Sequence, residues 1–295
     1  MDASKHRVFY YHGDASPLGG HITHPVEKLV HTQASVSLSQ AGGQAAGRTE
    51  RFKLDDIISC EAAYSEVFGT VHKANGNWTT LVTSVVEGFN VLEVVTADRI
   101  VSRMAVEHPR EGYHPKVSFV GSQFENLRIG GKPITPNIDL DLLAVAASET
   151  QNVPPVKDGD ILGSTADLDH IGFPDCAWPD HEGFIRKAVD RNSRITSNKD
   201  APEWLKRRFE WVGSAEARKQ KGHVLSSLVH EVQGAKPGST FGHVIHVPDF
   251  GNIFLGELLV SHGSFHLTML RAEMGCAADG TVSAGTTRGN GSTMP

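Results

Sequence analysis

The chain has 295 residues, of which 39% are apolar and 21% charged, with a net charge of −6 at pH 7. This composition is typical of a globular protein and argues against extended disorder. A net negative charge also argues against a nucleic-acid-binding protein, which usually presents a basic face. The basic residues that do cluster in sequence, which we interpret as a solvated helix face, are Lys206, Arg207, Arg208, Arg218, Lys219 and Lys221.

The cysteines and the N-terminal segment give information about the cellular compartment of the protein. Cys60, Cys176 and Cys276 are odd in number and far apart, which fits neither a disulfide framework nor a zinc ribbon. The opening residues contain no apolar signal segment, and no run approaches the ~20 apolar residues of a membrane helix. We expect a protein without a membrane span that is cytoplasmic by default, with export by a route that needs no classical signal left open.

Strand signals begin near the N-terminus. Val8 to Tyr11 is a short β-prone run, and the turn-rich residues 12–25 after it predict a loop. Residues 33–39 alternate apolar and polar side chains, the pattern of a half-buried strand. Residues 52–71 fit a helical period in one part and a strand period in another.

The next segments favour hairpins. Asn75-Gly76 predicts a tight turn because both residue types tolerate positive φ. Residues 78–108 are rich in Val, Ile and Thr and predict two or three strands interrupted near Gly88 and Asp98, with one long helix as the alternative. Gly130-Gly131 predicts a turn between two short strands, and Pro133 after it predicts an edge position.

Composition shifts over residues 150–202, which are rich in Pro, Gly and Asp and predict a long excursion from the sheet. A helix follows, with Asp200 as the expected cap, Pro202 at its start and Glu203 at capping-box spacing. Six residues share one face at helical spacing and predict a docking surface onto the sheet. They are Trp204, Leu205, Arg208, Phe209, Trp211 and Val212.

The C-terminal third predicts three strands between Phe241 and Met274. Apolar residues occupy both faces of residues 253–260, which predicts a central strand that is covered on both sides. In the following strand, apolar and polar side chains alternate through Met269 and Leu270, which predicts that one face is more exposed to water than the other. The Gly-rich residues 277–295 predict a tail that is either flexible or extended along an edge.

These patterns predict a mainly β fold, a sandwich or barrel-like antiparallel sheet, with a small helical and loop excursion around residues 150–222. We expect residues 1–295 to form a single β-rich domain, with that excursion as an insertion and residues 277–295 as a tail.

Sixteen histidines suggest metal binding, and the N-terminal segment holds the best candidates. His12, Asp14, His21 and His24 combine imidazole and carboxylate ligands that suit a divalent metal such as zinc. Residues three apart converge only in loops, so the hypothesis depends on this segment being turn-rich. The alternative is that these are polar histidines at strand ends. We expect no other cofactor.

A second group could carry nucleophilic catalysis, because a cysteine lies near potential bases. The alternative is an ordinary loop rich in Gly and Pro. The group consists of His170, Asp175, Cys176, Asp180 and His181. The chain contains no short sequence motif of a known catalytic class, so no catalytic residue is assigned.

Two segments, VTADRIVSRMAVEH and NLRIGGKPI, resemble segments of bacterial surface proteins of the choice-of-anchor type. The similarity covers residues 81–134 and consists of a strand, a Gly-Gly turn and a proline-containing strand. We expect the chain to depart from that group, because its sequence predicts neither a signal peptide nor an anchor. More broadly, it resembles an uncharacterised bacterial β-rich family.

The sequence favours a non-catalytic β-rich protein that works by binding or by self-assembly, as a homo-oligomer or filament with an unidentified ligand. One alternative is an enzyme with a histidine-lined, possibly metal-dependent pocket between the sheet and the 150–220 excursion. A further alternative is a carrier of a lipid or small molecule in an apolar cavity of the sheet.

Overall fold

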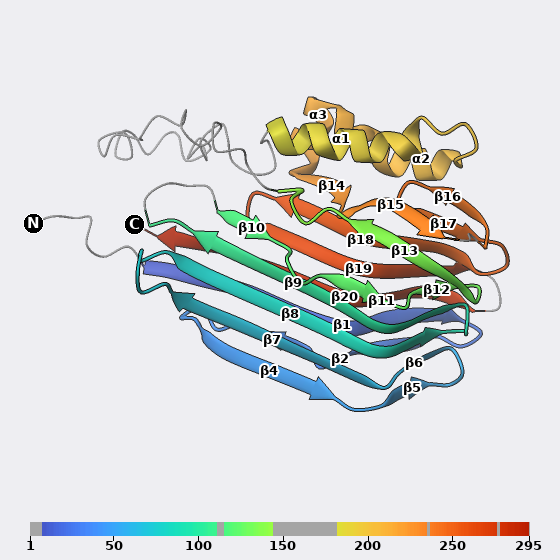
Figure 1. The fold of residues 1–295 in the computed structure, drawn as a ribbon, viewed down its shortest axis with the longest axis horizontal. Helices are drawn as coiled ribbons and strands as arrows, with labels where there is room; N and C mark the ends of the chain where they lie inside the picture. Colours follow the sequence, from blue (N-terminus) through green and yellow to red (C-terminus); the bar gives the residue numbers. More distant parts are fainter. Residues whose placement is uncertain (1–7, 111–114, 144–181, 235–236, 276–277, 295) are drawn as a thin grey trace, which may run out of the picture.

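The structure, a computed structural model, describes residues 8–110, 115–143, 182–234, 237–275 and 278–294. Two antiparallel sheets pack face to face, and a layer of short helices lies at one end of the sandwich (Figure 1). The predicted mainly β fold is confirmed, as an open sandwich rather than a closed barrel. No helix among these residues is long and apolar enough to cross a membrane.

Sheet A has the strand order β16-β17-β18-β19-β20-β1-β2, with β14 also paired to β18 and β3 to β1. Its strands are β1 (Val8–His24), β2 (Lys28–Gln33), β3 (Val36–Ser37), β14 (His223–Ser227), β16 (Ser239–Phe241), β17 (Val244–Val247), β18 (Gly251–Ser261), β19 (Ser264–Gly275) and β20 (Asp279–Met294).

Sheet B has the order β15-β13-β12-β9-β8-β6-β5, with β10 and β11 also paired to β9, and with β7 joining β4 to β8. Its strands are β4 (Gly43–Thr49), β5 (Phe52–Leu54), β6 (Ile58–Cys60), β7 (Ala62–Val71), β8 (Trp78–Val91), β9 (Val95–His108), β10 (Lys116–Ser118), β11 (Gln123–Glu125), β12 (Arg128–Ile129), β13 (Lys132–Ile138) and β15 (Val229–Gly234).

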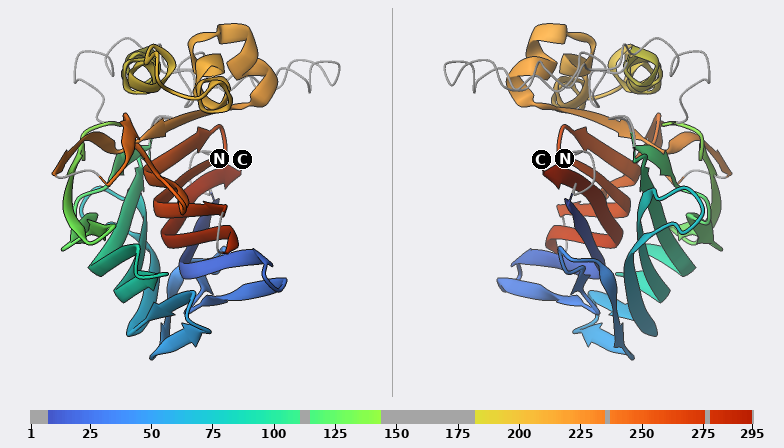
Figure 2. Two further views of the ribbon diagram at one scale, coloured as in Figure 1. Left: turned by 90° about the vertical axis from the view of Figure 1, so that its right-hand side faces the viewer. Right: turned by 90° about the vertical axis from the view of Figure 1, so that its left-hand side faces the viewer.

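The helical layer covers the outer face of sheet A near β14, β17 and β18, and β2 lies at the opposite end of that sheet (Figure 2). Part of its apolar contact is a cluster that joins Leu205 and Phe209 to Phe254 of β18, and Phe184 and Val212 join the main core. The elements of this layer are α1 (Glu182–Thr196), α2 (Glu203–Glu210), the 3-10 helix η4 (Trp211–Gly213) and α3 (Ala215–Lys221).

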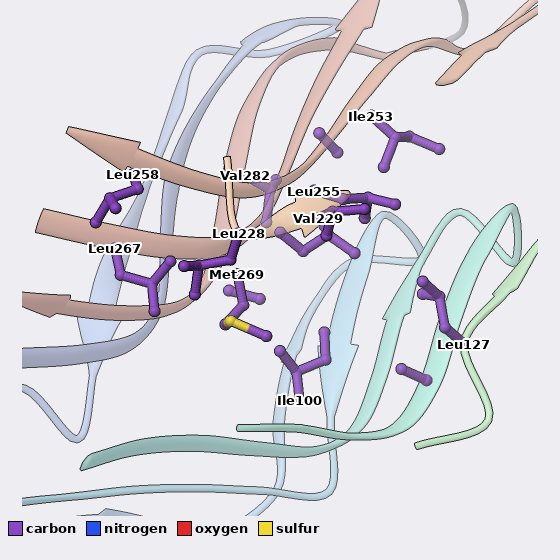
Figure 3. Close-up of a cluster of buried hydrophobic side chains, with 14 of the residues drawn as sticks. Ile100, Leu127, Leu228, Val229, Ile253, Leu255, Leu258, Leu267, Met269 and Val282 are labelled. Carbon is purple, nitrogen blue, oxygen red and sulfur yellow. The ribbon is translucent and has the colours of Figure 1, made fainter. Parts of the chain in front are cut away.

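The main core fills the space between the sheets. Ile100 of sheet B lies near Met269 and Leu255 of sheet A, and all three side chains are fully buried (Figure 3). Alternation in the strands sends these side chains inward and leaves the polar ones outside. Polar contact between the sheets is also present, since the buried hydroxyls of Ser102 and Thr287 lie 2.7 Å apart.

Several predictions for sheet B need correction. Residues 52–71 form strands, and residues 78–108 form two strands whose turn lies at Leu92-Glu93 (both with positive φ) rather than at Gly88 or Asp98. Pro133 is not at an edge, because β13 lies between β12 and β15. The β15 pairing begins at Ile134, so the missing N–H of the proline costs no bond on that side.

The largest correction concerns the two ends of the described chain. Residues 12–24, predicted as a loop, continue β1, and residues 279–294, predicted as a flexible or edge tail, form β20. The two strands pair from Val8 opposite Met294 to His24 opposite Asp279 in the middle of sheet A. Glycine is needed here for close strand approach: a Cβ on Gly20 would lie 2.3 Å from the Thr281 carbonyl oxygen.

The helix predictions are confirmed in part. A helix does follow Pro202, but Pro202 rather than Asp200 occupies the cap position. Leu205, Phe209 and Val212 are buried as predicted, whereas Trp204 is 46% exposed. Helix α1 was not predicted, because its face mixes charged residues with few large apolar ones.

Substituting Gly20 tests whether β1 and β20 are central. We expect Gly20→Ala to lower the free energy of unfolding by about 1–3 kcal/mol, because the new methyl group meets backbone atoms that cannot move independently. Gly263→Ala is the control, since a Cβ there meets nothing within 4 Å, and it should change stability by less than about 0.5 kcal/mol. Urea unfolding monitored by circular dichroism measures both. Equal stability of the two variants would contradict the central placement.

Candidate functional site

Four neighbouring strands of sheet A share a break in their side-chain alternation. In each, two consecutive residues are both buried, where a regular strand would place one of them outside. The strand register aligns these pairs in one row across the sheet. They are Leu255-Gly256 in β18, Met269-Leu270 in β19, Ala284-Gly285 in β20 and Pro17-Leu18 in β1.

Glycine makes the break feasible in two of the strands. Gly256 and Gly285 have φ values of 63° and 64°, which other residues rarely adopt. On either side of the row, side chains again point outward. Thr286 opposes Ser16 on one side of it, and Ser283 opposes Gly19 on the other. The outer surface between these two lines of side chains is therefore left hollow.

A pocket of about 320 Å³ occupies this hollow. Five hydroxyl side chains and one imidazole line it, together with two glycines, and none of these lining residues carries a carboxylate, an ammonium or a guanidinium group. The lining residues are Ser16, Gly19, Gly20 and His21 of β1, Thr32 of β2, and Thr281, Ser283 and Thr286 of β20. The accessible surface of the pocket is mostly apolar, with neutral hydroxyl groups among it, and the Thr286 hydroxyl lies 3.5 Å from that of Thr268.

The predicted N-terminal metal set does not come together. His12 Nε2 lies 2.9 Å from Asp14 Oδ2, and the Ser37 hydroxyl donates to Asp14 Oδ1 at 2.6 Å. His21 pairs instead with Glu27, at 3.2 Å. Because β1 is extended, at about 3.3 Å a residue, His12 and His21 are separated by about 30 Å.

His24 lies at the far end of β1, where the strand turns away, three residues beyond His21. The hypothesis required a turn-rich loop, and the segment is a strand, so the geometry does not support one site from these four residues. Among the described residues, no three His, Cys, Asp or Glu side chains are grouped to hold a metal ion.

A cluster of charged side chains joins the helical layer to sheet A. Glu257 of β18 accepts two hydrogen bonds from Arg271 of β19, from Nε at 2.6 Å and from Nη2 at 2.9 Å. It accepts a third from Arg208 of α2, at 3.2 Å. Both guanidiniums lie over the Phe254 ring, and Arg271 also contacts Glu273. The prediction of a solvated basic face is therefore wrong for Arg208, which lies instead on the docking face that its helical spacing predicted.

The Glu257 carboxylate stays charged although it is almost fully buried. Burial alone would raise its pKa, but the hydrogen bonds and positive charge of Arg271, with the charge of Arg208, outweigh this effect and lower the pKa. Removing either arginine would leave a buried charge with fewer partners, which is costly in proteins.

His243, in the turn between β16 and β17, lies beside this cluster. The ring is 1% exposed and meets the edge of Phe209, with ring centroids 5.1 Å apart. Neither ring nitrogen has a hydrogen-bond partner in the part of the chain that the structure describes. Burial lowers the pKa of His243 to about 4, so the ring is neutral at physiological pH.

Sequence analysis missed both features, although each leaves a signal. Glu257 is the one charged residue of β18, and Arg271 lies in an apolar stretch of β19 that also holds Glu273, a pattern that indicates buried charge pairs. The pocket leaves only an interrupted alternation in the sequence, and in residues 12–24 the same Pro and Gly residues predict turns. The proposed group around Cys176 lies outside the described residues. Cys60, which is described, is a buried free cysteine.

The buried histidines predict loss of stability in acid. Burial lowers the pKa of both His108 and His243 from 6.5 to about 4. Between pH 6.5 and 4 the two rings are therefore protonated in the unfolded chain but neutral in the native protein. The free energy of unfolding falls as the pH drops through this range and levels off below pH 4. At pH 5 the loss should be about 2 kcal/mol for each ring, relative to pH 7.5.

Urea unfolding at pH 7.5 and pH 5 measures this loss in the unmodified protein and in His243→Phe. The variant should lose about 2 kcal/mol of the difference between the two pH values, the share of the His243 ring, while His108 and His266, whose pKa values burial also lowers, keep theirs. His31→Gln, at an exposed position of β2, is the control and should keep the full difference. A pH dependence that His243→Phe leaves intact would contradict the assignment.

Comparison with known proteins adds a family and no activity. Residues 9–261 match the family described as Domain of unknown function (DUF8256), which covers most of the chain. No curated protein and no solved structure matches the chain. On the extent of that match, the chain belongs to the DUF8256 family.

Proposed function

We propose that this protein is a non-catalytic binding protein that takes a small, neutral, polyhydroxylated ligand, such as a saccharide, in the pocket on the outer face of sheet A. The observation that carries the proposal is the lining itself: five hydroxyls and one imidazole, with no charged carboxylate, ammonium or guanidinium group.

The chemistry of such a lining matches a polyol. Each Ser or Thr hydroxyl both donates and accepts, so it can pair with a ligand hydroxyl in either sense. The threonine methyl groups of Thr32, Thr281 and Thr286 offer apolar contact to the C–H faces of a sugar ring. A charged ligand would find no opposite charge among the lining residues and would lose solvation on entry.

The pocket is built on paired strands rather than on loops. Ser16 and Thr286 are held opposite each other by the β1–β20 ladder, so their hydroxyls are positioned before a ligand arrives. Such preorganisation reduces the entropy lost on binding. An apolar cavity for a lipid is not favoured, because buried side chains such as Leu258, Leu267 and Met269 fill the space between the sheets (Figure 3).

Calorimetric titration with glycerol, glucose, galactose, mannose and maltose tests the proposal. We expect at least one of these to bind, and Ser283→Ala combined with Thr286→Val to weaken binding about tenfold or more, since each lost hydrogen bond is worth about 1 kcal/mol. Thr83→Val is the matched control on the outer face of sheet B and should leave affinity unchanged. Failure of the whole panel, or equal binding by the double variant, would contradict the proposal.

We also propose self-association through β2. This strand ends the order of sheet A, so one side of its backbone has no neighbour in the sheet. Two of the large apolar side chains most exposed to solvent lie in and just before it, Leu29 at 62% and Val26 at 60%. A second copy that adds its own β2 would pair the backbone groups and cover both side chains.

Light scattering coupled to size exclusion tests this association. The unmodified chain of 31.9 kDa should elute as a dimer or larger species. Leu29→Lys should shift it to the monomer, because a charge on the edge opposes strand addition. Val120→Lys, at an equally exposed apolar position away from β2, should not. A monomer at all concentrations for the unmodified chain would remove the proposal.

A further inference from the structure

We infer that a small oxyanion binds between the helical layer and sheet A, beside His243 and held by Arg191 of α1 and Arg208 of α2. This site is separate from the hydroxyl-lined pocket, and it does not depend on the function proposed for that pocket.

The first support is the state of the two guanidiniums. The Nε atoms of Arg191 and Arg208 are buried, and neither has a hydrogen-bond partner within the described residues. A guanidinium N–H only donates, so the partner of each must be an acceptor. Buried polar atoms are nearly always hydrogen-bonded. Among the same residues, Arg99 and Arg218 also have a buried Nε without a hydrogen-bond partner, but Arg191 and Arg208 are distinguished because both lie close enough to His243 to act on its charge, so we place one shared acceptor beside that ring.

The carboxylates nearby are already engaged by other atoms of these side chains. Arg191 gives Nη2 to Asp139 at 2.8 Å and Nη1 to the Ser227 carbonyl oxygen at 2.8 Å. Arg208 gives Nη2 to Glu257, which also holds Arg271. The Nε edges of Arg191 and Arg208 therefore remain available after the protein's own acids have been paired.

The balance of buried charge also favours an anion. Three guanidiniums, those of Arg191, Arg208 and Arg271, lie close enough to His243 to act on its charge, and Glu257 is the carboxylate that does so. The other two acids paired with these arginines, Asp139 and Glu273, are 30% and 31% exposed, so water screens them. Arg208 is 36% exposed and is screened in the same way, so the buried charges that remain are those of Arg191 and Arg271 against that of Glu257, an excess of one positive charge.

His243 completes the site. Its neutral ring has one N–H donor and one acceptor nitrogen, both buried and both without a partner among the described residues. The N–H can donate to an oxyanion that the two arginines hold. An oxyanion has several acceptor oxygens and can satisfy all three side chains together, which a single water molecule with two acceptor sites cannot.

Thermal unfolding of the full chain at matched ionic strength tests the inference, with sodium phosphate, sodium acetate and sodium chloride as probes. We expect phosphate, acetate or both to raise Tm by about 5 °C over chloride when saturating, since a ligand of the native state alone stabilises it. Phosphate alone would identify a phosphate-type ligand, and acetate alone a carboxylate. Equal Tm in all three salts would overturn the inference.

Arg208→Gln should abolish the salt-specific rise, because it removes one of the two guanidinium donors. Arg207→Gln is the matched control, at the adjacent and exposed position of the same helix, and should keep the rise in full. If Arg208→Gln still responds to the anion as the unmodified chain does, the anion binds elsewhere and the inference fails.

A measurement on the unmodified chain covers the case in which Arg208→Gln does not fold. Proton NMR of the histidine rings follows His243, whose signal is identified by its loss in His243→Gln. The bound anion should raise the midpoint of the His243 titration by at least one pH unit relative to chloride, because it favours the protonated ring. An unchanged midpoint would overturn the inference.

Discussion

The outer face of sheet A depends on one constraint: four strands must break their alternation at the same place. Because a slip in side-chain phase turns every later residue to the opposite face, a break in one strand alone would bury polar groups beyond it. Here β18, β19, β20 and β1 shift together, so Thr286 and Ser283 both face outward on either side of the row. The same shift turns Arg271 to the outer face, where it donates hydrogen bonds to Glu257 on the side of the sheet that the helical layer covers.

The charged cluster explains how a small helical layer is fixed on a polar face. Its apolar contacts are of two kinds: Leu205 and Phe209 pack with Phe254 in a separate cluster, and Phe184, Ala188 and Val212 belong to the main core. The buried pair of Glu257 and Arg271 orients the helical layer more than it stabilises the fold, since desolvation offsets much of the attraction between such charges. The hydrogen bond that Arg208 donates to Glu257 fixes the position of α2 on the sheet.

Particular residues show what sequence alone could predict. Residues 253–260 are apolar on both faces, and β18 is indeed central, covered by the core on one side and by Phe209 and its neighbours on the other. The segment around Pro17 and Gly20 looked like a loop, because the same residues that make turns also allow a strand to approach a neighbour closely. Met269 and Leu270 are both buried, which no rule of strict alternation predicts.

The pocket was beyond sequence analysis for a topological reason. Its walls come from β1, β2 and β20, and because β1 and β20 are the first and last strands of the described chain, no local pattern contains it. Pairing two distant segments costs loop-closure entropy that only the finished ladder recovers. Ser16 and Thr286 therefore lie opposite each other only when sheet A is complete, and the pocket and the closure of the fold depend on the same set of backbone hydrogen bonds.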